Sequence, residues 1–312
     1  MNIDMGIGNG LSDCHIHLSL KSGFTIKQWN MADDNQKTAW ISSILEKYKK
    51  NNIIYLKDGG DAYGVSLYAK KLADKNGIKY KTPGFAIYKE GSYGDFLGKS
   101  IKTMGDFDRL FEQLLSLDID HLKLIVTGIM DFDNFGYYEK TQFTSSELNY
   151  MISRAKKENL KVMVHANGNE AVKMTIDAGA DTIEHGYLLD KQTLKEFIGS
   201  STTRIPTLAP LGNILKYKPK AMKNQLDTVN KIYQLQIENL KFALENNIEV
   251  GLGSDAGAYM VEHPNGIIDE INLMKEAGIS HKTIKDLMIK QIQKNEIEPK
   301  GLCLSQKSIF WG

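Results

Sequence analysis

Short apolar runs alternate with longer amphipathic segments along the whole chain. The amphipathic segments repeat their apolar positions every three to four residues, as surface helices do, and the short runs have the length of strands. Strands are predicted at Leu11–Leu18, Ile53–Lys57, Lys79–Ile87, His121–Thr127, Lys161–His165, Thr182–His185, Arg204–Leu208 and Glu249–Gly253. Helices are predicted at Gln36–Lys50, Ser66–Asn76, Asp106–Leu117, Ser145–Asn159, Glu170–Ala178, Lys191–Ile198, Gln225–Asn246 and Ile267–Ala277, with one more at Lys282–Lys294.

End signals support several of these helices. Thr144 and Glu147 have the spacing of a capping box, in which each side chain accepts a hydrogen bond from a free backbone N–H. Gly77 and Gly179 stand where two helices are predicted to end, a place that favours glycine.

The order of the elements predicts the fold. Strands separated by helices pair in parallel, because a parallel connection needs a crossover of about a dozen residues or more. Eight such units favour a closed α/β barrel, the (β/α)8 or TIM barrel, as a single domain over residues 1–312 with its core from 11 to 295. An open doubly wound sheet is the alternative. The longest insertion, Ala209–Asn224, is predicted as a loop over one face.

Composition excludes several classes of protein. The chain is 42% hydrophobic and 25% charged, and 39 basic against 38 acidic residues give a net charge of +1, so no global field favours nucleic acid or a membrane surface. Two cysteines make no disulfide framework, and we find neither a secretory signal nor an apolar run of about 18 residues. We expect a cytoplasmic protein acting on a small molecule, and leave a homo-oligomer open.

Histidines and one aspartate stand where predicted strands end. His15 and His17 end the first strand, His165 the fifth and His185 the sixth, and Asp255 follows the eighth. The carboxyl ends of all barrel strands gather on one face, where barrel active sites form. Each residue alone could be structural, but their joint placement predicts a metal site. Imidazole and carboxylate favour zinc, with manganese, iron and nickel as alternatives.

Lys123 lies inside the apolar fourth run, where an unpaired ammonium is costly. It could snorkel or pair with a carboxylate. Alternatively, desolvation and neighbouring cations lower its pKa, and the free amine reacts with carbon dioxide. The resulting carbamate could bridge two metals about 3.5–4 Å apart, and it is the interpretation we favour.

The motifs around these residues resemble the amidohydrolase superfamily, and most closely its dipeptidase and imidazolonepropionase-like branch. The resemblance runs from about Ser12 to Met274. It is carried by DCHIH at 13–17, HLKLIVTG at 121–128, VMVHANG at 162–168, DTIEHGYLLD at 181–190 and GLGSDAGAY at 251–259.

The resemblance implies two metals and a proton shuttle. One metal would be held by His15, His17 and Asp255, and a second by His165 and His185, with carboxylated Lys123 as the bridge. Asp255 would also take the proton of the attacking hydroxide and pass it to the leaving amine, which agrees with two-metal hydrolysis in general.

Two features depart from the family pattern. Family members usually carry a small β-rich domain built from both termini, which we expect to be absent or vestigial here, because few residues flank the motifs. Deaminases and imidazolonepropionase of the superfamily typically place a glutamate three residues after the fifth-strand histidine, where this chain has Gly168. This difference favours amide or peptide hydrolysis over deamination.

Substrate contacts are harder to predict. His263 follows the eighth strand, Lys57 ends the second, and Tyr137 or Tyr138 lies in the loop after the fourth. Each could bind a substrate carboxylate or backbone, or could be an ordinary loop residue. None of the three arginines stands at a predicted strand end, so no bidentate carboxylate clamp is visible.

Three further polar residues are predicted to be structural. Cys14 alternates with the histidines and should point away from them. His121 begins its strand and so lies at the other end of the barrel. Glu184 precedes His185 and should face outward, toward the helices.

The leading interpretation is a metal-dependent hydrolase that cleaves an amide bond of a dipeptide or N-acyl amino acid. A metal-bound hydroxide would attack, with Asp255 as proton shuttle. Hydrolysis of a cyclic amide, lactone or ester would use the same centre. A catalytically inactive barrel that keeps its metal as a structural or binding element is the non-enzymatic alternative.

Overall fold

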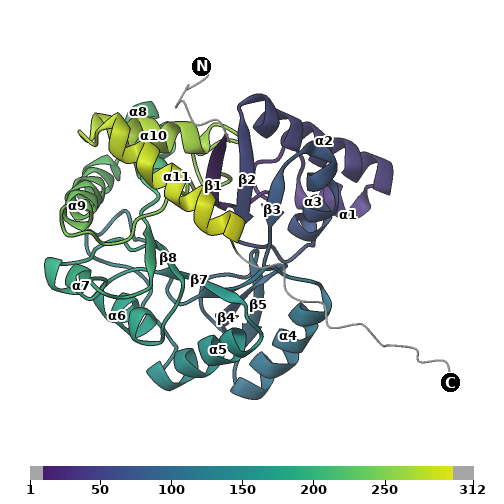
Figure 1. Ribbon diagram of the computed structural model, residues 1–312, viewed down its shortest axis with the longest axis horizontal. Helices are drawn as coiled ribbons and strands as arrows, with labels where there is room; N and C mark the ends of the chain where they lie inside the picture. Colours follow the sequence, from purple (N-terminus) through teal and green to yellow (C-terminus); the bar gives the residue numbers. More distant parts are fainter. Residues whose placement is uncertain (1–9, 298–312) are drawn as a thin grey trace.

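The computed structural model describes residues 10–297, which form a ring of parallel strands surrounded by helices (Figure 1). The strands are β1 (Leu11–Ile16), β2 (Ile53–Asp58), β3 (Lys79–Lys81), β4 (Ala86–Lys89), β5 (Gly98–Ile101), β6 (His121–Ile125), β7 (Lys161–Ala166), β8 (Thr182–His185) and β9 (Thr203–Ile205). The helices are α1 (Ile26–Met31), α2 (Asp34–Lys50), α3 (Val65–Ala73), α4 (Met104–Ser116), α5 (Ser145–Lys157), α6 (Asn169–Asp177), α7 (Lys191–Lys195), α8 (Ala209–Tyr217), α9 (Leu226–Glu245), α10 (Gly266–Glu276) and α11 (His281–Ile297), with 3₁₀ helices η1 (Asp74–Asn76) and η2 (Lys220–Met222).

All the paired strands are parallel and fall into two sheets, of order β1-β2-β3 and β5-β4-β6-β7-β8-β9. Residues 249–256 join the sheets on one side, since they bond to β9 and to β1 through isolated bridges. On the other side the Asp120 N–H donates to the Thr82 carbonyl at 2.9 Å, which links the end of β3 to the start of β6. The predicted α/β barrel is confirmed, although single bonds rather than continuous ladders close it.

The predicted helix ends agree with the structure. The Glu147 N–H donates to the Thr144 hydroxyl and the Thr144 N–H donates to the Glu147 carboxylate, so the predicted capping box opens α5. Gly77 and Gly179 have φ angles of 71° and 78°. This left-handed conformation is common after the last residue of a helix, and glycine adopts it without the steric penalty of a Cβ atom.

Two predictions about strands were wrong. The run Lys79–Ile87 forms two strands, β3 and β4, because Pro83 and Gly84 between them interrupt the ladder. Glu249–Gly253 forms no continuous strand, since its glycines weaken strand pairing. The short strand β5 was not predicted.

The segment Ala209–Asn224 was predicted as a loop, and this was also wrong. It contains α8 and η2, and Pro210 lies in the first turn of α8, where a helix needs no backbone N–H. The short helix α1 was likewise not predicted.

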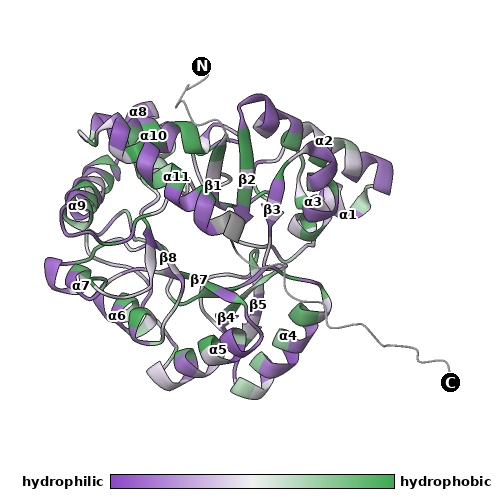
Figure 2. Cartoon of the chain, viewed as in Figure 1, coloured by the Kyte–Doolittle hydropathy of each residue, from purple (hydrophilic) through white to green (hydrophobic). Residues whose placement is uncertain are grey.

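One end of the barrel is covered and the other holds the polar residues of interest. Helix α11 crosses the end where the strands begin (Figure 1), and its Gln291 amide donates to the Ser12 hydroxyl at 2.6 Å. The outer helices carry hydrophobic and hydrophilic residues in alternation (Figure 2), so that each packs one face on the strands. No helix between residues 10 and 297 is both long and apolar enough to cross a membrane.

Candidate metal centre

Three side chains that can ligate a metal meet at the carboxyl ends of the strands. His15 Nε2 and His17 Nε2 are 3.2 Å apart, and Asp255 Oδ1 lies 3.5 Å from the first and 3.6 Å from the second. One ligand atom from each residue therefore falls within 4.8 Å of the others. Two imidazoles and a carboxylate at this spacing form a donor set that suits a divalent cation.

Glycines allow these three side chains to approach so closely. A Cβ at Gly253 would lie 2.8 Å from the His15 Cβ, and a Cβ at Gly59 would lie 2.2 Å from Cε1 of the His17 ring. Asp255 has a φ of 59°, and its N–H donates to the His15 carbonyl at 2.7 Å. The backbone itself thus sets the position of this carboxylate against β1.

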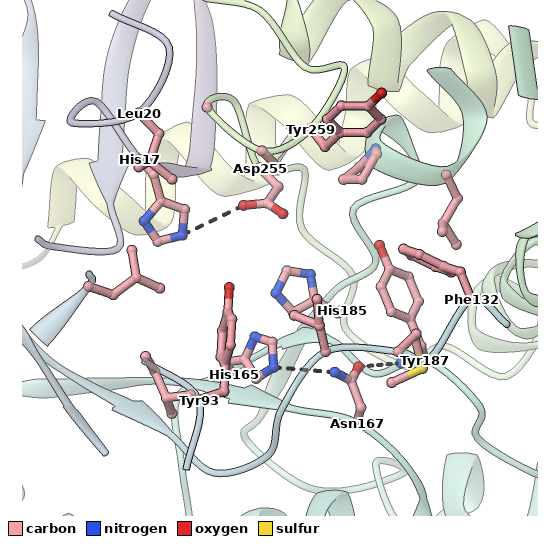
Figure 3. Close-up of a pocket in the computed structure, with 18 of the residues that line it drawn as sticks. His17, Leu20, Tyr93, Phe132, His165, Asn167, His185, Tyr187, Asp255 and Tyr259 are labelled. Atoms are coloured by element: carbon pink, nitrogen blue, oxygen red, sulfur yellow. Dashed lines mark hydrogen bonds and ion pairs between the residues drawn. The ribbon is translucent and has the colours of Figure 1, made fainter. Parts of the chain in front are cut away.

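A second pair of histidines completes the cluster. The rings of His165 and His185 have centroids 4.6 Å apart, and the His185 ring lies 5.0 Å from that of His15. His185 Nδ1 lies 2.7 Å from the Thr207 hydroxyl, and His165 Nε2 lies 3.3 Å from the Gly128 carbonyl. Figure 3 shows His17, His165, His185 and Asp255 around one space.

Burial keeps the four rings neutral. It lowers the pKa of His15, His17 and His185 well below the usual 6.5 and that of His165 to about 4, and the Lys123 amine acts in the same direction. Neutral imidazole is the form that binds a metal.

The Lys123 amine is buried beside this cluster. The side chain, on β6, is 1% exposed, and within the described part of the chain its Nζ has no hydrogen-bond partner. Burial lowers the pKa of this amine from 10.5 to about 8, against the opposing effect of Glu184 and Asp255. An orphaned nitrogen here fits the predicted carbamate, whose charge neighbouring cations would neutralise.

Glu184 points inward, so the prediction that it faces the helices was wrong. Its Oε2 lies 2.6 Å from His15 Nδ1, and both side chains are fully buried. His185 has a φ of 65°, which breaks the in-and-out alternation of the strand. The side chains of Glu184 and His185 can therefore both reach the interior. A carboxylate on the second ring nitrogen is the usual partner of a metal-binding histidine.

Two more buried carboxylates that sequence reasoning missed support the cluster. Asp13 accepts hydrogen bonds from the N–H and hydroxyl of Ser254, which ties β1 to the segment before Asp255. Asp58 accepts from the Gly60 N–H at 2.7 Å and so fixes the turn that holds Gly59 beside His17. Burial raises the pKa of both carboxyls to about 7.

None of the predicted substrate contacts, Lys57, Tyr137, Tyr138 and His263, lines the cavity beside the cluster. Lys57 lines a second, smaller cavity at the opposite ends of the strands, where Cys14 also lies. The two ring nitrogens of His263 lie 2.6 Å from the Tyr48 hydroxyl and 3.0 Å from the Leu20 carbonyl, and Tyr137 is 70% exposed in its loop. Side-chain direction in loops depends on such packing, which residue order does not reveal.

The cluster lies at the base of a cavity of about 530 Å³, a volume typical of sites for small ligands (Figure 3). Tyr93, Asn167 and Tyr187 line it next to the histidines. The Tyr93 ring centroid is 6.0 Å from that of His165, and Asn167 accepts from the Tyr187 N–H at 3.0 Å. The arrangement can therefore hold a cation, a base and a small molecule in one cavity.

Comparisons with known proteins agree with this geometry. A model described as the amidohydrolase family matches residues 10–303. Among solved structures, a Xaa-Pro dipeptidase is 21% identical, with a TM-score of 0.71 over 93% of this chain and 76% of that one. The ochratoxinase of A. niger is 16% identical, with a TM-score of 0.73 over 89% and 69%. These identities show the shared barrel fold.

Curated relatives match over a shorter stretch. An uncharacterized protein of Mycobacterium bovis is 28% identical over 131 residues, which cover 41% of this chain and 35% of the relative. The chain thus spans about a third of the length of the curated relatives that it matches.

Proposed function

The chain belongs to the amidohydrolase family, and on that premise we propose that it is a hydrolase that cleaves an amide bond at a centre of divalent metal ions. The observation that carries the proposal is the meeting of His15, His17 and Asp255 within 4.8 Å at the base of a cavity. The orphaned Lys123 amine beside them is the second support.

The donor set fits the metals predicted from the sequence. His15, His17 and Asp255 would hold one cation, and His165 and His185 a second, with Lys123 between them as a carbamate. Zinc suits imidazole and carboxylate best, and manganese, iron or nickel would also be accepted. Divalent cations bound there would lower the pKa of a water molecule and polarise the scissile carbonyl.

The protein's own groups would position the reactants and move the proton. Asp255 is half-buried, and burial raises the pKa of its carboxyl to about 7, so it could accept a proton from water and pass it to the leaving amine. Glu184 holds the tautomer and direction of His15. The burial of His15 and His17 limits bulk water around the scissile bond.

Several bonds could be cleaved by this centre. Dipeptides and N-acyl amino acids are the substrates predicted from the sequence, and the names of the dipeptidase and prolidase neighbours support testing them. Cyclic amides, lactones and esters need the same attack on a carbonyl and form the second candidate class. A purely structural metal would leave the Asp255 carboxylate without a role as base.

The proposal is tested with Asp255→Asn and with a chelator. Activity is measured on a panel of dipeptides, acyl anilides, lactones and esters. Removal of metal should abolish hydrolysis, and zinc or manganese should restore it. Asp255→Asn should reduce kcat at least about a thousandfold with the fold unchanged by circular dichroism. A near-normal rate in the variant, or indifference to the chelator, would refute the proposal.

A further inference from the structure

The wall of the cavity above the centre is mainly apolar. Among the described residues that line it, only Lys123 and Asp255 carry a formal charge, and both belong to the centre. The remaining wall is mainly aliphatic and aromatic, with Phe96, Ile129, Phe132, Leu211, Ile214 and Met222 among its members.

The apolar surface continues to the mouth of the cavity. Ile129 and Tyr259 both line it while being 53% and 47% exposed. Figure 3 shows Phe132 and Tyr187 together on one side of the histidines. An apolar path therefore runs from solvent to the scissile position.

Among the described residues that line this space, Lys123 is the only lysine or arginine that could receive a substrate carboxylate. Arg109 pairs with Asp106 and Arg154 with Glu112, both on the outer helices. Arg204 is buried and donates to the side-chain oxygen Oε1 of Gln236 at 2.7 Å. All three arginines thus lie outside the wall that the described residues form.

Backbone N–H groups at the N-terminal end of α8 offer a substrate carboxylate few hydrogen bonds in place of a cation. Helix α8 reaches the cavity with Pro210 and Leu211 at its N-terminal end, where an anion would otherwise find N–H groups. Pro210 has no N–H, and the N–H of Ala209 donates to the Glu270 carboxylate at 2.7 Å. This helix end is therefore partly closed to an anion.

We infer that the substrate is an uncharged amide whose group beside the scissile bond is apolar, either an acyl chain or an aryl ring. The inference rests on the proposed function and narrows it. A dipeptide or an N-acyl amino acid carries a carboxylate near the scissile bond. That charge would have to leave water for a wall that, outside the centre, offers it no cationic side chain, which costs binding free energy.

Two substrates of equal length test this directly with the metal-loaded enzyme. Hexanoyl p-nitroanilide and the mono-p-nitroanilide of adipic acid differ only in whether the far end of the chain is a methyl or a carboxylate. We expect kcat/KM, followed by release of p-nitroaniline, to favour the hexanoyl compound by about a hundredfold or more.

A variant that adds a cation to the wall should weaken this preference. Met222 lines the cavity and is half-buried, so Met222→Arg should lower the ratio of hexanoyl to adipoyl kcat/KM by about tenfold. Tyr217→Arg is the matched control, because Tyr217 is 54% exposed on the neighbouring α8 and lies outside the wall. A ratio of two substrates on one enzyme is independent of how much variant is folded.

The outcomes separate the inference from the proposed function. Equal rates on both anilides, or cleavage of zwitterionic dipeptides with the hexanoyl compound left intact, would overturn the inference and leave amide hydrolysis standing. Failure to cleave any amide when loaded with zinc or manganese would overturn the proposed function, and the inference with it.

Discussion

Replacing Glu184 by glutamine tests whether a carboxylate that contacts His15 controls how tightly His15 and its neighbours bind metal. The Glu184 carboxylate lies 2.6 Å from His15 Nδ1, with both side chains fully buried, so solvent does not screen the contact. Burial raises the pKa of this carboxyl, and the Lys123 amine opposes that shift. Glutamine keeps the shape and can still accept from Nδ1–H, so Glu184→Gln removes the charge and little else.

The size of the effect follows from that single change. A hydrogen bond to a charged group contributes about 1.5–3 kcal/mol, and one between neutral groups about 0.5–1.5 kcal/mol. The difference, about 1–2 kcal/mol, corresponds to a factor of roughly 5–30 in an equilibrium constant. Carboxylates that support metal-binding histidines typically change affinity by about 10–100-fold, which overlaps this range.

The assay is a chelator-competition titration of the metal-free protein with zinc or manganese. We expect Glu184→Gln to weaken the tightest site by about tenfold. Glu270→Gln is the matched control, because Glu270 is also a fully buried carboxylate but accepts from the Ala209 N–H instead of a histidine. An affinity within twofold of the original protein, or an equal loss in both variants, would refute a specific role of Glu184 on His15.

Three further changes probe other parts of the molecule. Lys123→Ala should lower the metal content from about two equivalents toward one, measured by elemental analysis, and unchanged stoichiometry would exclude a bridging role. Gly59→Ala should weaken metal binding about tenfold or more, because the new Cβ would lie 2.2 Å from the His17 ring, whereas Gly105→Ala, with its nearest atom at 3.7 Å, should not. Burial raises the pKa of Glu270 from 4.5 to about 8, so the folded state keeps a proton that the unfolded chain releases, and stability should fall as pH rises through that window. The free energy of unfolding, measured by urea denaturation at several pH values, should fall less steeply in Glu270→Gln, by up to about 1.4 kcal/mol per pH unit. Identical slopes against pH in the two proteins would contradict this prediction.

Local pattern was enough to predict the barrel and the gathering of its polar residues. The helix and strand periods are properties of neighbouring residues, and the capping box at Thr144 needs only a spacing of three. Parallel strands connected by helices place their carboxyl ends on one face. For that reason, residues as distant as His15 and Asp255 could be predicted to meet before any coordinates were known.

Tertiary packing decided where side chains point once the regular pattern ends. Strand alternation predicts that the Glu184 side chain points outward, but the left-handed backbone at His185 lets the side chains of both residues point inward. Likewise, the His263 side chain contacts Tyr48 instead of the cavity. The apolar wall also depends on α8, which was predicted as part of a loop because Pro210 and Pro219 of that segment are turn formers when read alone. Positive φ angles and helix docking are stabilised by contacts distant in sequence, so only the folded chain reveals the chemistry of the cavity wall.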